Sequence, residues 1–374
     1  MAGQRKGIFR ELISPYLKEK LSELENIYGV ESSEYQGIAR QYVRSDLEDV
    51  VDKTRERRRH YEAEMHGEEH GFNLKGVERL YRRTVLLEPT TACIAHCRWC
   101  LRGQYDIAML TPDEIIAAME YFAKDQDIRE ILITGGDPLT APPALGFILD
   151  KIDEMAPNIE IVRIGTRVPM HDPSRVNDQL IESFQKKRRY RLEIGIHVCH
   201  PLEFWDESVA VIRKFLELGI RIYNQHPLLK GVNDSAEVLI ALYDAMRRHD
   251  VEAHYLFHAI PMLGMDHHRT SLARGLQLIS QLNSGGKFSG RSKPHYAAMT
   301  DIGKIVLYEG SVLGRNEDDN MVLLRSGYTL EDRVRYNSSW RKPDSVEIDK
   351  NGLMNVWYSD GTDDLPREIL SLHE

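Results

Sequence analysis

The sequence has only 4 cysteines in 374 residues, and it lacks several features that would assign it to a specialised class of protein. So few cysteines exclude a disulfide scaffold and predict a reducing, cytoplasmic compartment. The first residues, MAGQRKGIFRELI, lack the apolar core of a signal peptide, and no apolar run approaches the ~20 residues of a membrane helix. The net charge of −9 leaves no basic excess for nucleic acid. We therefore expect a cytoplasmic globular protein with neither nucleic-acid nor membrane partners.

The two ends of the sequence differ in pattern from its middle. Residues 1–83 are predicted to form a helical, charged extension, because SPYLKEKLSELENIYGV has apolar residues at helical spacing and no strand pattern follows it there. Residues 301–374 are predicted to be a small β-rich region without helices between its strands. Its strand-like runs are KIVLYEG, MVLLR, SVEID and LMNVWYSD, with DKNG as a hairpin turn.

In residues 84–300, six strand-like runs alternate with helical patterns, the first of which has Thr111 as its predicted N-cap. The strand-like runs are TVLLE, EILIT, IEIVRIG, RLEIGIHV, IRIYN and AHYLF. Such alternation predicts an α/β protein with a parallel sheet and crossover helices. Six repeats without a Gly-x-Gly-x-x-Gly fingerprint favour a partial (β/α)6 barrel of the TIM type over a dinucleotide-binding fold. In such barrels the active site lies at the carboxyl ends of the strands.

Three of the four cysteines, Cys93, Cys97 and Cys100, lie within eight positions directly after the first of these strands. Three interpretations of the spacing are open. Cys97 and Cys100 match a C-x-x-C redox pair, which leaves Cys93 without a role. A non-catalytic zinc module would take His96 as its fourth ligand. A [4Fe–4S] cluster held by three thiolates would leave one iron open to a ligand, and the spacing favours this interpretation.

The stretch CIAHCRWC, with Trp99 before its last cysteine, resembles the C-x3-C-x-aromatic-C signature of radical S-adenosylmethionine (SAM) enzymes. In that family the open iron chelates SAM, and reductive cleavage of SAM yields a 5′-deoxyadenosyl radical. ITGGDPL, at the end of the second strand, resembles the family's Gly-Gly-Asp segment, whose backbone meets the methionyl amino group of SAM. The resemblance implies a cluster on the three cysteines, an external electron donor of the flavodoxin or ferredoxin type, and SAM contacts at Trp99, Gly135, Gly136 and Asp137.

Over roughly residues 75–310 the sequence resembles the lysine 2,3-aminomutase group of these enzymes. CIAHCRWCLRG, EIVRIGTRVP, HVCHP, NQHPLLKGVND and HHRT match the group's strand ends in order and spacing. The resemblance implies that His197 and Gln225 contact SAM and that Arg102 holds the carboxylate of a small-molecule α-amino acid substrate. A guanidinium suits that role because it binds a carboxylate through two parallel hydrogen bonds. By analogy, the helical N-terminal extension is a candidate surface for a homo-oligomer.

The sequence departs from that group at the cofactor loop. Aminomutases of the group carry pyridoxal phosphate (PLP) on a lysine in a glycine-rich loop. Here Ser289–Gly290 is followed by RSKPHYAAMTDIGKIVLYEG, which lacks the glycine run, and Lys287, Lys293 and Lys304 lie outside a matching context. We therefore expect chemistry without PLP on a free α-amino acid, such as desaturation or another radical oxidation or isomerisation. The alternative is a PLP-dependent 2,3-aminomutase with a relocated lysine.

The substrate positions also depart from the lysine enzymes. The two aspartates that bind the remote ammonium of lysine fall on Ile260 and about Met299, and an apolar side chain cannot pair with a buried ammonium. Lysine in its usual pose is therefore not expected. Three other acidic residues are candidate partners for an amine or guanidinium presented differently: Asp266, Asp301 and Glu309. Three arginines lie near the position where the group holds the PLP phosphate: Arg79, Arg82 and Arg83.

The fourth cysteine, Cys199, shares strand parity with His197, so both are predicted to point to the same side of their strand. A thiol beside the substrate would donate a hydrogen atom to a substrate radical, which makes an amino acid epimerase another alternative. Burial as an ordinary packing residue is the competing interpretation of Cys199. With no further cysteine, a second iron–sulfur cluster on cysteine ligands is excluded.

Overall fold

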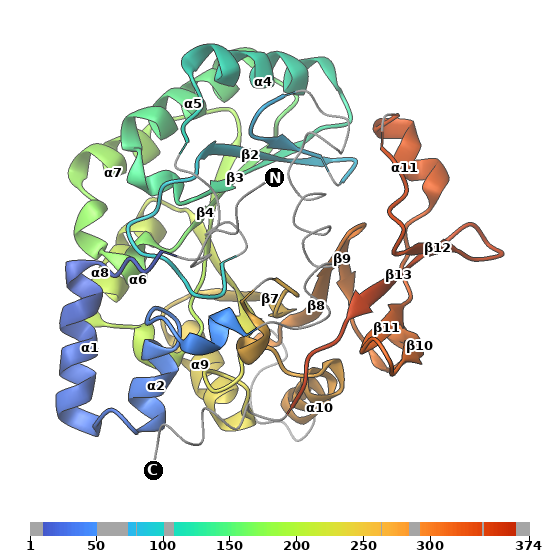
Figure 1. The fold of residues 1–374 in the computed structure, drawn as a ribbon. Coiled ribbons are helices and arrows are strands. Elements are labelled where there is room, and N and C mark those ends of the chain that lie inside the picture. Colours follow the sequence, from blue (N-terminus) through green and yellow to red (C-terminus); the bar gives the residue numbers. More distant parts are fainter. Residues whose placement is uncertain are drawn as a thin grey trace, which may run out of the picture.

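The computed structural model describes residues 10–50, 74–79, 81–100, 108–262, 264–283, 292–338 and 340–363. Nine strands form one sheet in the order β1 to β9, and four form a second sheet in the order β10-β11-β13-β12. The large sheet curls into an open half-barrel, and the small sheet lies beside its last strands (Figure 1). The predicted partial barrel is confirmed.

The large sheet contains seven parallel strands, β2 to β8, with β1 and β9 antiparallel at its two edges. Its strands are β1 (Val77–Glu78), β2 (Thr84–Thr90), β3 (Glu130–Gly135), β4 (Ile161–Thr166), β5 (Arg191–Ile196), β6 (Arg221–Leu228), β7 (Glu252–His258), β8 (His295–Thr300) and β9 (Gly303–Val306). The six predicted strands coincide with β2 to β7. The pattern missed β8, because HYAAMT contains two alanines, which have low β-propensity.

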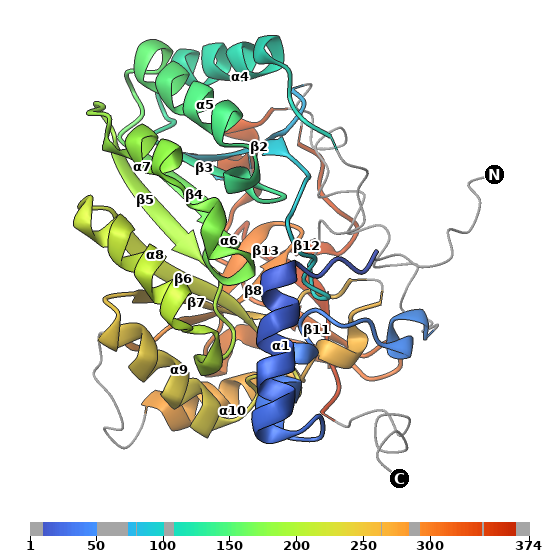
Figure 2. The same ribbon diagram turned by 90° about the vertical axis from the view of Figure 1, so that its left-hand side faces the viewer.

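Helices cover the outer face of the half-barrel (Figure 2). They are α4 (Pro112–Lys124), α5 (Pro142–Met155), α7 (Asp178–Gln185), α8 (Asp206–Glu217), α9 (Ala236–Arg248) and α10 (Leu272–Asn283), with the short α6 (Val168–His171) directly after β4. The predicted cap of α4 is present: the Thr111 side chain accepts from the Glu114 N–H, and the Glu114 side chain accepts from the Thr111 N–H.

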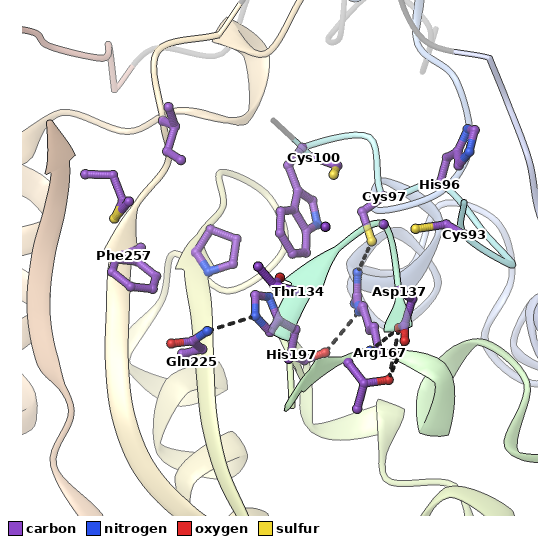
Figure 3. A pocket seen from close by; sticks show the side chains of 18 of the residues that line it. Cys93, His96, Cys97, Cys100, Thr134, Asp137, Arg167, His197, Gln225 and Phe257 are labelled. Carbon is purple, nitrogen blue, oxygen red and sulfur yellow. Dashed lines mark hydrogen bonds between the residues drawn. The ribbon is translucent and has the colours of Figure 1, made fainter. Parts of the chain in front are cut away.

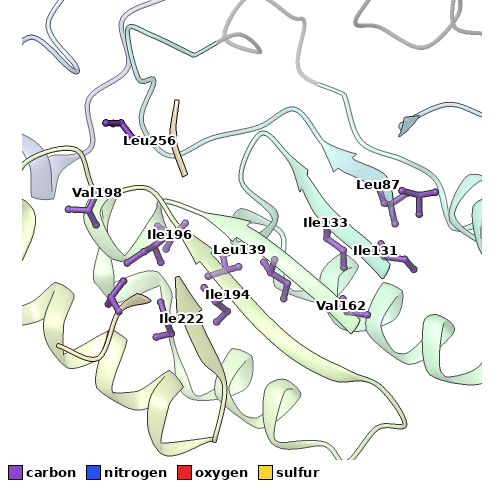
Figure 4. Packing of buried hydrophobic residues seen from close by; sticks show 14 of the residues in the cluster. Leu87, Ile131, Ile133, Leu139, Val162, Ile194, Ile196, Val198, Ile222 and Leu256 are labelled. Carbon is purple, nitrogen blue, oxygen red and sulfur yellow. The ribbon is translucent and has the colours of Figure 1, made fainter. Parts of the chain in front are cut away.

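The hydrophobic core lies between the outer face of the sheet and these helices (Figure 4). Alternate residues of the strands supply it, because successive side chains of a strand point to opposite faces. In β4, Val162 and Ile164 are fully buried in the core, whereas Arg163 and Gly165 face the inside of the curl. The other face of the sheet is therefore free to line a site.

The small sheet contains β10 (Val312–Asn316), β11 (Met321–Leu324), β12 (Val346–Ile348) and β13 (Met354–Ser359). The predicted DKNG turn joins the antiparallel pair β12 and β13. The expectation of no helix between the C-terminal strands is wrong, since α11 (Leu330–Tyr336) lies between β11 and β12. This helix is short and has few apolar residues, and its buried Arg333 anchors it by donating to the Ile302 carbonyl at 2.6 Å.

The N-terminal region contains α1 (Pro15–Tyr28), α2 (Ser33–Ala39) and a single 3-10 turn, η1 (Asp46–Asp49). Its buried Leu17, Leu21 and Tyr42 pack against Ala95 and Cys97 of the cysteine-containing loop. Part of the predicted helical extension, residues 51–73, lies outside the described residues. Among the helices that are described, none is long and apolar enough to span a membrane.

Candidate active site at the carboxyl ends of the strands

A cavity of about 270 Å³ lies inside the curl. Its wall brings together most of the residues singled out from the sequence: Cys93, Cys97, Trp99, Cys100, Gly135, Gly136, Asp137, His197 and Gln225. Figure 3 shows the three cysteines with Asp137, His197 and Gln225. These residues come from the loop after β2 and from the ends of β3, β5 and β6. Arg102, the predicted carboxylate ligand, lies outside the described residues.

The Gly-Gly-Asp segment packs backbone to backbone against the chain that leads to Cys93. Gly136 N–H donates to the Thr90 carbonyl at 2.6 Å, and Asp137 N–H donates to the Ala92 carbonyl at 2.8 Å. Gly135 has a φ of +115°, and a Cβ on Gly136 would lie 2.2 Å from the Ala92 oxygen. Gly135 is needed because its φ is positive, and Gly136 is needed because a side chain there would collide with the Ala92 carbonyl.

The Asp137 carboxylate joins this segment to the end of β4. It accepts hydrogen bonds from the Thr166 hydroxyl at 2.8 Å and from the backbone N–H groups of Leu139, Arg167 and Val168 at 3.1, 2.7 and 3.1 Å. Burial raises the pKa of Asp137 to about 6 even though these hydrogen bonds act in the opposite direction. The Asp137 backbone is bonded within the protein as well, since its N–H donates to the Ala92 carbonyl and its carbonyl accepts from the Thr140 N–H at 2.9 Å.

Arg167, which follows β4, is the residue at the centre of the site that sequence analysis missed. Its guanidinium donates to the Cys97 sulfur at 2.9 Å, to the His197 carbonyl at 3.0 Å and to the Glu203 carboxylate at 2.6 Å. Burial acts against its charge, but the neighbouring Cys97 and Glu203 raise the pKa of Arg167 well above its usual value. It also lies over two aromatic rings, 5.0 Å from Tyr42 and 5.1 Å from Trp99.

The N-terminal region holds the cysteine-containing loop from the other side. His96 Nδ1 lies 2.7 Å from the Arg10 carbonyl, and Arg98 N–H donates to the Gln41 carbonyl at 2.8 Å. The Arg98 guanidinium also forms a buried ion pair with Glu48. The loop is therefore fixed between residues 10–50 and the end of β4.

Trp99, His197 and Gln225 line the cavity, and Figure 3 labels His197 and Gln225. The Trp99 and His197 rings are parallel to within 2°, with centroids 6.0 Å apart. His197 Nε2 lies 3.3 Å from Gln225 Nε2. Flat rings beside hydrogen-bonding groups suit a planar, polar ligand such as a purine.

Cys199 does not line this cavity. Its side chain is fully buried among Leu229, Val232 and Ala259, with Trp99 packed against the group. Burial raises the pKa of its thiol well above the usual value. β5 ends at Ile196, so the alternation of a strand no longer sets the direction of a side chain three residues later.

The cavity wall also contains Lys304, on β9. Its amine lies 5.0 Å from the ring centre of Tyr255 and 5.4 Å from that of Phe257, and burial lowers its pKa to about 8. The two apolar residues at the positions of the lysine-binding aspartates, Ile260 and Met299, line the cavity as well.

None of the three arginines considered for a PLP phosphate lines the cavity. Arg79 forms an ion pair with Asp125, Arg82 forms one with Asp127, and Arg83 is exposed. Of the acidic candidates for a distal amine, Asp266 and Asp301 are also absent from the cavity wall. The side chain of Glu309 lies outside the described residues.

The donors present fit a [4Fe–4S] cluster better than a zinc ion. A cluster takes three thiolates on three different irons, whereas zinc needs four ligands around one point. The three thiols lie in one loop on the cavity wall, but within the described ranges no three His, Cys, Asp or Glu side chains gather as ligands of a single ion.

Replacing Arg167 tests its place at the centre of the site. Arg167→Met leaves Glu203 buried without its cation, so we expect the free energy of unfolding to fall by about 3–5 kcal/mol. Urea denaturation followed by circular dichroism measures this change. Arg175→Met is the control: Arg175 is exposed, and its ion pair with Asp172 is worth at most about 1 kcal/mol. A loss at Arg167 no larger than that of the control would contradict the account.

Asp137 predicts a pH dependence of stability. Its folded pKa of about 6 lies above the ordinary 3.8, so between these values the folded chain retains a proton that the unfolded chain has released. The free energy of unfolding should therefore fall as pH rises through this window, by up to about 3 kcal/mol. Asp137→Asn should be less stable overall and should lack this slope. Parallel pH profiles of the two proteins in urea denaturation would refute the assignment.

Comparison with known proteins identifies the domain. Residues 87–242 match the model of the radical SAM superfamily. The chain is 32% identical over 258 residues to the L-lysine 2,3-aminomutase of Acetoanaerobium sticklandii, a match that covers 67% of this chain and 60% of that enzyme. It is 30% identical over 235 residues to the glutamate 2,3-aminomutase of Clostridioides difficile, covering 62% of this chain and 54% of that enzyme.

The matches thus span about half to six-tenths of the length of these relatives. Among solved structures, Streptococcus suis SuiB bound to S-adenosylmethionine aligns with a TM-score of 0.46 and 15% identity, over 59% of this chain and 50% of that one. The radical SAM superfamily uses a [4Fe–4S] cluster and SAM. Residues 87–242 are a radical SAM domain, and the chain is related in sequence to the lysine 2,3-aminomutase group of that superfamily.

Proposed function

We propose that this radical SAM enzyme takes a hydrogen atom from a free α-amino acid and does so without PLP. Cys93, Cys97 and Cys100 would hold the cluster, which with SAM supplies a 5′-deoxyadenosyl radical when bound. Trp99, His197 and Gln225 would line the SAM side of the cavity, and Arg102 would orient the substrate carboxylate. The lysine and glutamate 2,3-aminomutases among the relatives support an amino acid as the substrate class.

The observation that carries the proposal is the pairing of the arginines expected to hold a PLP phosphate. Arg79 is buried, paired with Asp125 and hydrogen-bonded to the Tyr121 hydroxyl at 2.6 Å. Arg82 is paired with Asp127. Neither cation is directed to the cavity, and the sequence lacks the glycine-rich lysine loop. Two of the three candidate arginines are thus paired elsewhere and the sequence lacks the lysine loop, and both observations support chemistry without PLP.

Desaturation is the net reaction we favour. One hydrogen atom of the substrate passes to the 5′-deoxyadenosyl radical. A second then leaves as a proton and an electron, and the electron goes to an acceptor of the iron–sulfur or flavodoxin class. The cavity holds a base for that proton, because the lowered pKa of Lys304 leaves part of its amine uncharged near neutral pH. An apolar wall at Ile260 and Met299 keeps water away from the radical.

Lys304 also favours a second candidate, a PLP-dependent 2,3-aminomutase in which this lysine replaces the missing one. An uncharged amine in a desolvated, aromatic-lined cavity is the form that condenses with an aldehyde. This candidate would need a phosphate-binding group other than Arg79 and Arg82. It is distinguished from the first by whether PLP becomes attached to Lys304.

The test is release of 5′-deoxyadenosine by anaerobically reconstituted, reduced protein supplied with SAM. We expect release with one member of a panel of free amino acids, without added PLP, together with a product lighter by two hydrogens in mass spectrometry. Borohydride treatment in the presence of PLP should leave no pyridoxyl group on Lys304. Turnover only with PLP, an unchanged product mass and a pyridoxyl-Lys304 peptide would instead establish the aminomutase. An unchanged mass with inverted configuration would indicate an epimerase.

A further inference from the structure

Two adjacent histidines beside the cavity are buried without hydrogen-bond partners. His267 and His268 belong to the 3-10 turn η5 (Asp266–His268) and are 6% and 2% exposed. All four of their ring nitrogens are buried and unpartnered, and the ring centroids lie 3.9 Å apart. His268 lines the cavity. Buried polar groups in folded proteins are almost always hydrogen-bonded, so an unpartnered imidazole on a cavity wall calls for a ligand.

Two other buried histidines, His258 and His226, are satisfied within the protein. His258 lines the same cavity, but its Nδ1 lies 3.2 Å from the Tyr358 hydroxyl and its Nε2 lies 2.8 Å from the Thr270 carbonyl. The Nε2 of His226 lies 3.0 Å from the Tyr243 hydroxyl. These rings have structural partners, whereas His268 presents a free donor and a free acceptor at the cavity.

The backbone around His268 is held on both sides, so its ring is positioned before a ligand arrives. The His268 carbonyl accepts from Lys230 N–H at 2.9 Å. The next residue, Arg269, is fully buried and donates to the carbonyls of Ala259, Ser359 and Asp360 at 2.9, 2.5 and 3.1 Å. These bonds tie the turn to the end of β7 and to β13. Such preorganisation lowers the entropic cost of binding a ligand.

The surroundings of the two rings disfavour protonation of the imidazoles. Burial lowers the pKa of His267 to about 4, and Arg40, Arg98 and Lys230 lower it further. His268 shows the same trend, with burial again the largest cause. Arg98 is itself paired with Glu48. The imidazoles are therefore neutral at neutral pH, and each carries one N–H donor within the influence of Arg40, Arg98 or both.

We propose that His268 donates a hydrogen bond to a carboxylate group of the amino acid bound in the cavity. This proposal rests on the proposed function for the identity of its ligand. A carboxylate supplies the acceptor that the His268 ring lacks, and the nearby cations favour its charge. The apolar Ile260 and Met265, which line the cavity as well, give an ammonium group no partner at this wall. His268 is thereby a substrate-binding residue in addition to Arg102.

The first test uses simple probes and does not require the natural substrate. Holoprotein with an oxidised cluster is labelled with ¹⁵N at histidine, and its ring signals are followed during titration with acetate, glycine or methylammonium. Acetate and glycine should shift the His268 signals saturably, and methylammonium should not. The control Met265→Leu, which changes the same wall without removing a donor, should retain the shifts. Absence of a carboxylate-dependent shift at His268 would overturn the proposal.

The second test separates the amino acid from SAM as the source of the carboxylate. With the substrate found in the panel, His268→Phe should raise KM at least tenfold with a smaller change in kcat, and His268→Gln, which keeps an N–H donor, should recover part of that loss. The Kd for SAM should be unchanged in both variants, and iron content and thermal unfolding should match wild type. A weaker Kd for SAM with an unaltered KM would overturn the assignment to the amino acid. If no amino acid reacts, the proposed function fails while the acetate titration still decides the role of His268.

Discussion

The buried charge of Arg167 is the constraint on which the geometry of this site depends. A guanidinium without water must find its partners in the protein, and the partners of Arg167 come from three parts of the chain. They are the Cys97 sulfur, the His197 carbonyl after β5, the Glu203 carboxylate and the side chain of Gln41 from the N-terminal region. One side chain thus fixes the cysteine-containing loop relative to the barrel and to residues 10–50.

A second buried charge, Asp137, lies just after β3 and also joins separate parts of the chain. Its carboxylate gathers the N–H groups at the end of β4, while its own segment is hydrogen-bonded to the chain before Cys93. Because Arg167 directly follows β4, both charges hold the same strand end. The residues expected to contact SAM thus stand on a wall that is ordered before SAM arrives, as a reaction through a highly reactive radical requires.

The sequence predicted those parts of the molecule that follow local rules. β2 to β7 and the Thr111 cap have their patterns in contiguous residues, and parallel strand ends must meet at one edge, which brings Cys93, Gly136, His197 and Gln225 to one cavity. Contacts between residues far apart in the chain leave no local pattern in the sequence. Arg167 stood in the matched segment RIGTRVP, but its bonds to Cys97 and Gln41 cross 70 and 126 residues. Lys304 reaches the cavity only because β9 returns antiparallel to β8. Strand alternation gave the wrong direction for Cys199 because β5 ends at Ile196, three residues before it.

The proposed function requires that Cys93, Cys97 and Cys100 hold a [4Fe–4S] cluster and that this cluster binds SAM at its open iron. Its most direct test is the electron paramagnetic resonance spectrum of the reduced, reconstituted protein, recorded before and after SAM is added. The account predicts an iron–sulfur signal, with iron and sulfide bound in equal amounts, whose spectrum changes when SAM binds the open iron. Bound zinc without sulfide, or an iron–sulfur signal that SAM leaves unchanged, would contradict it.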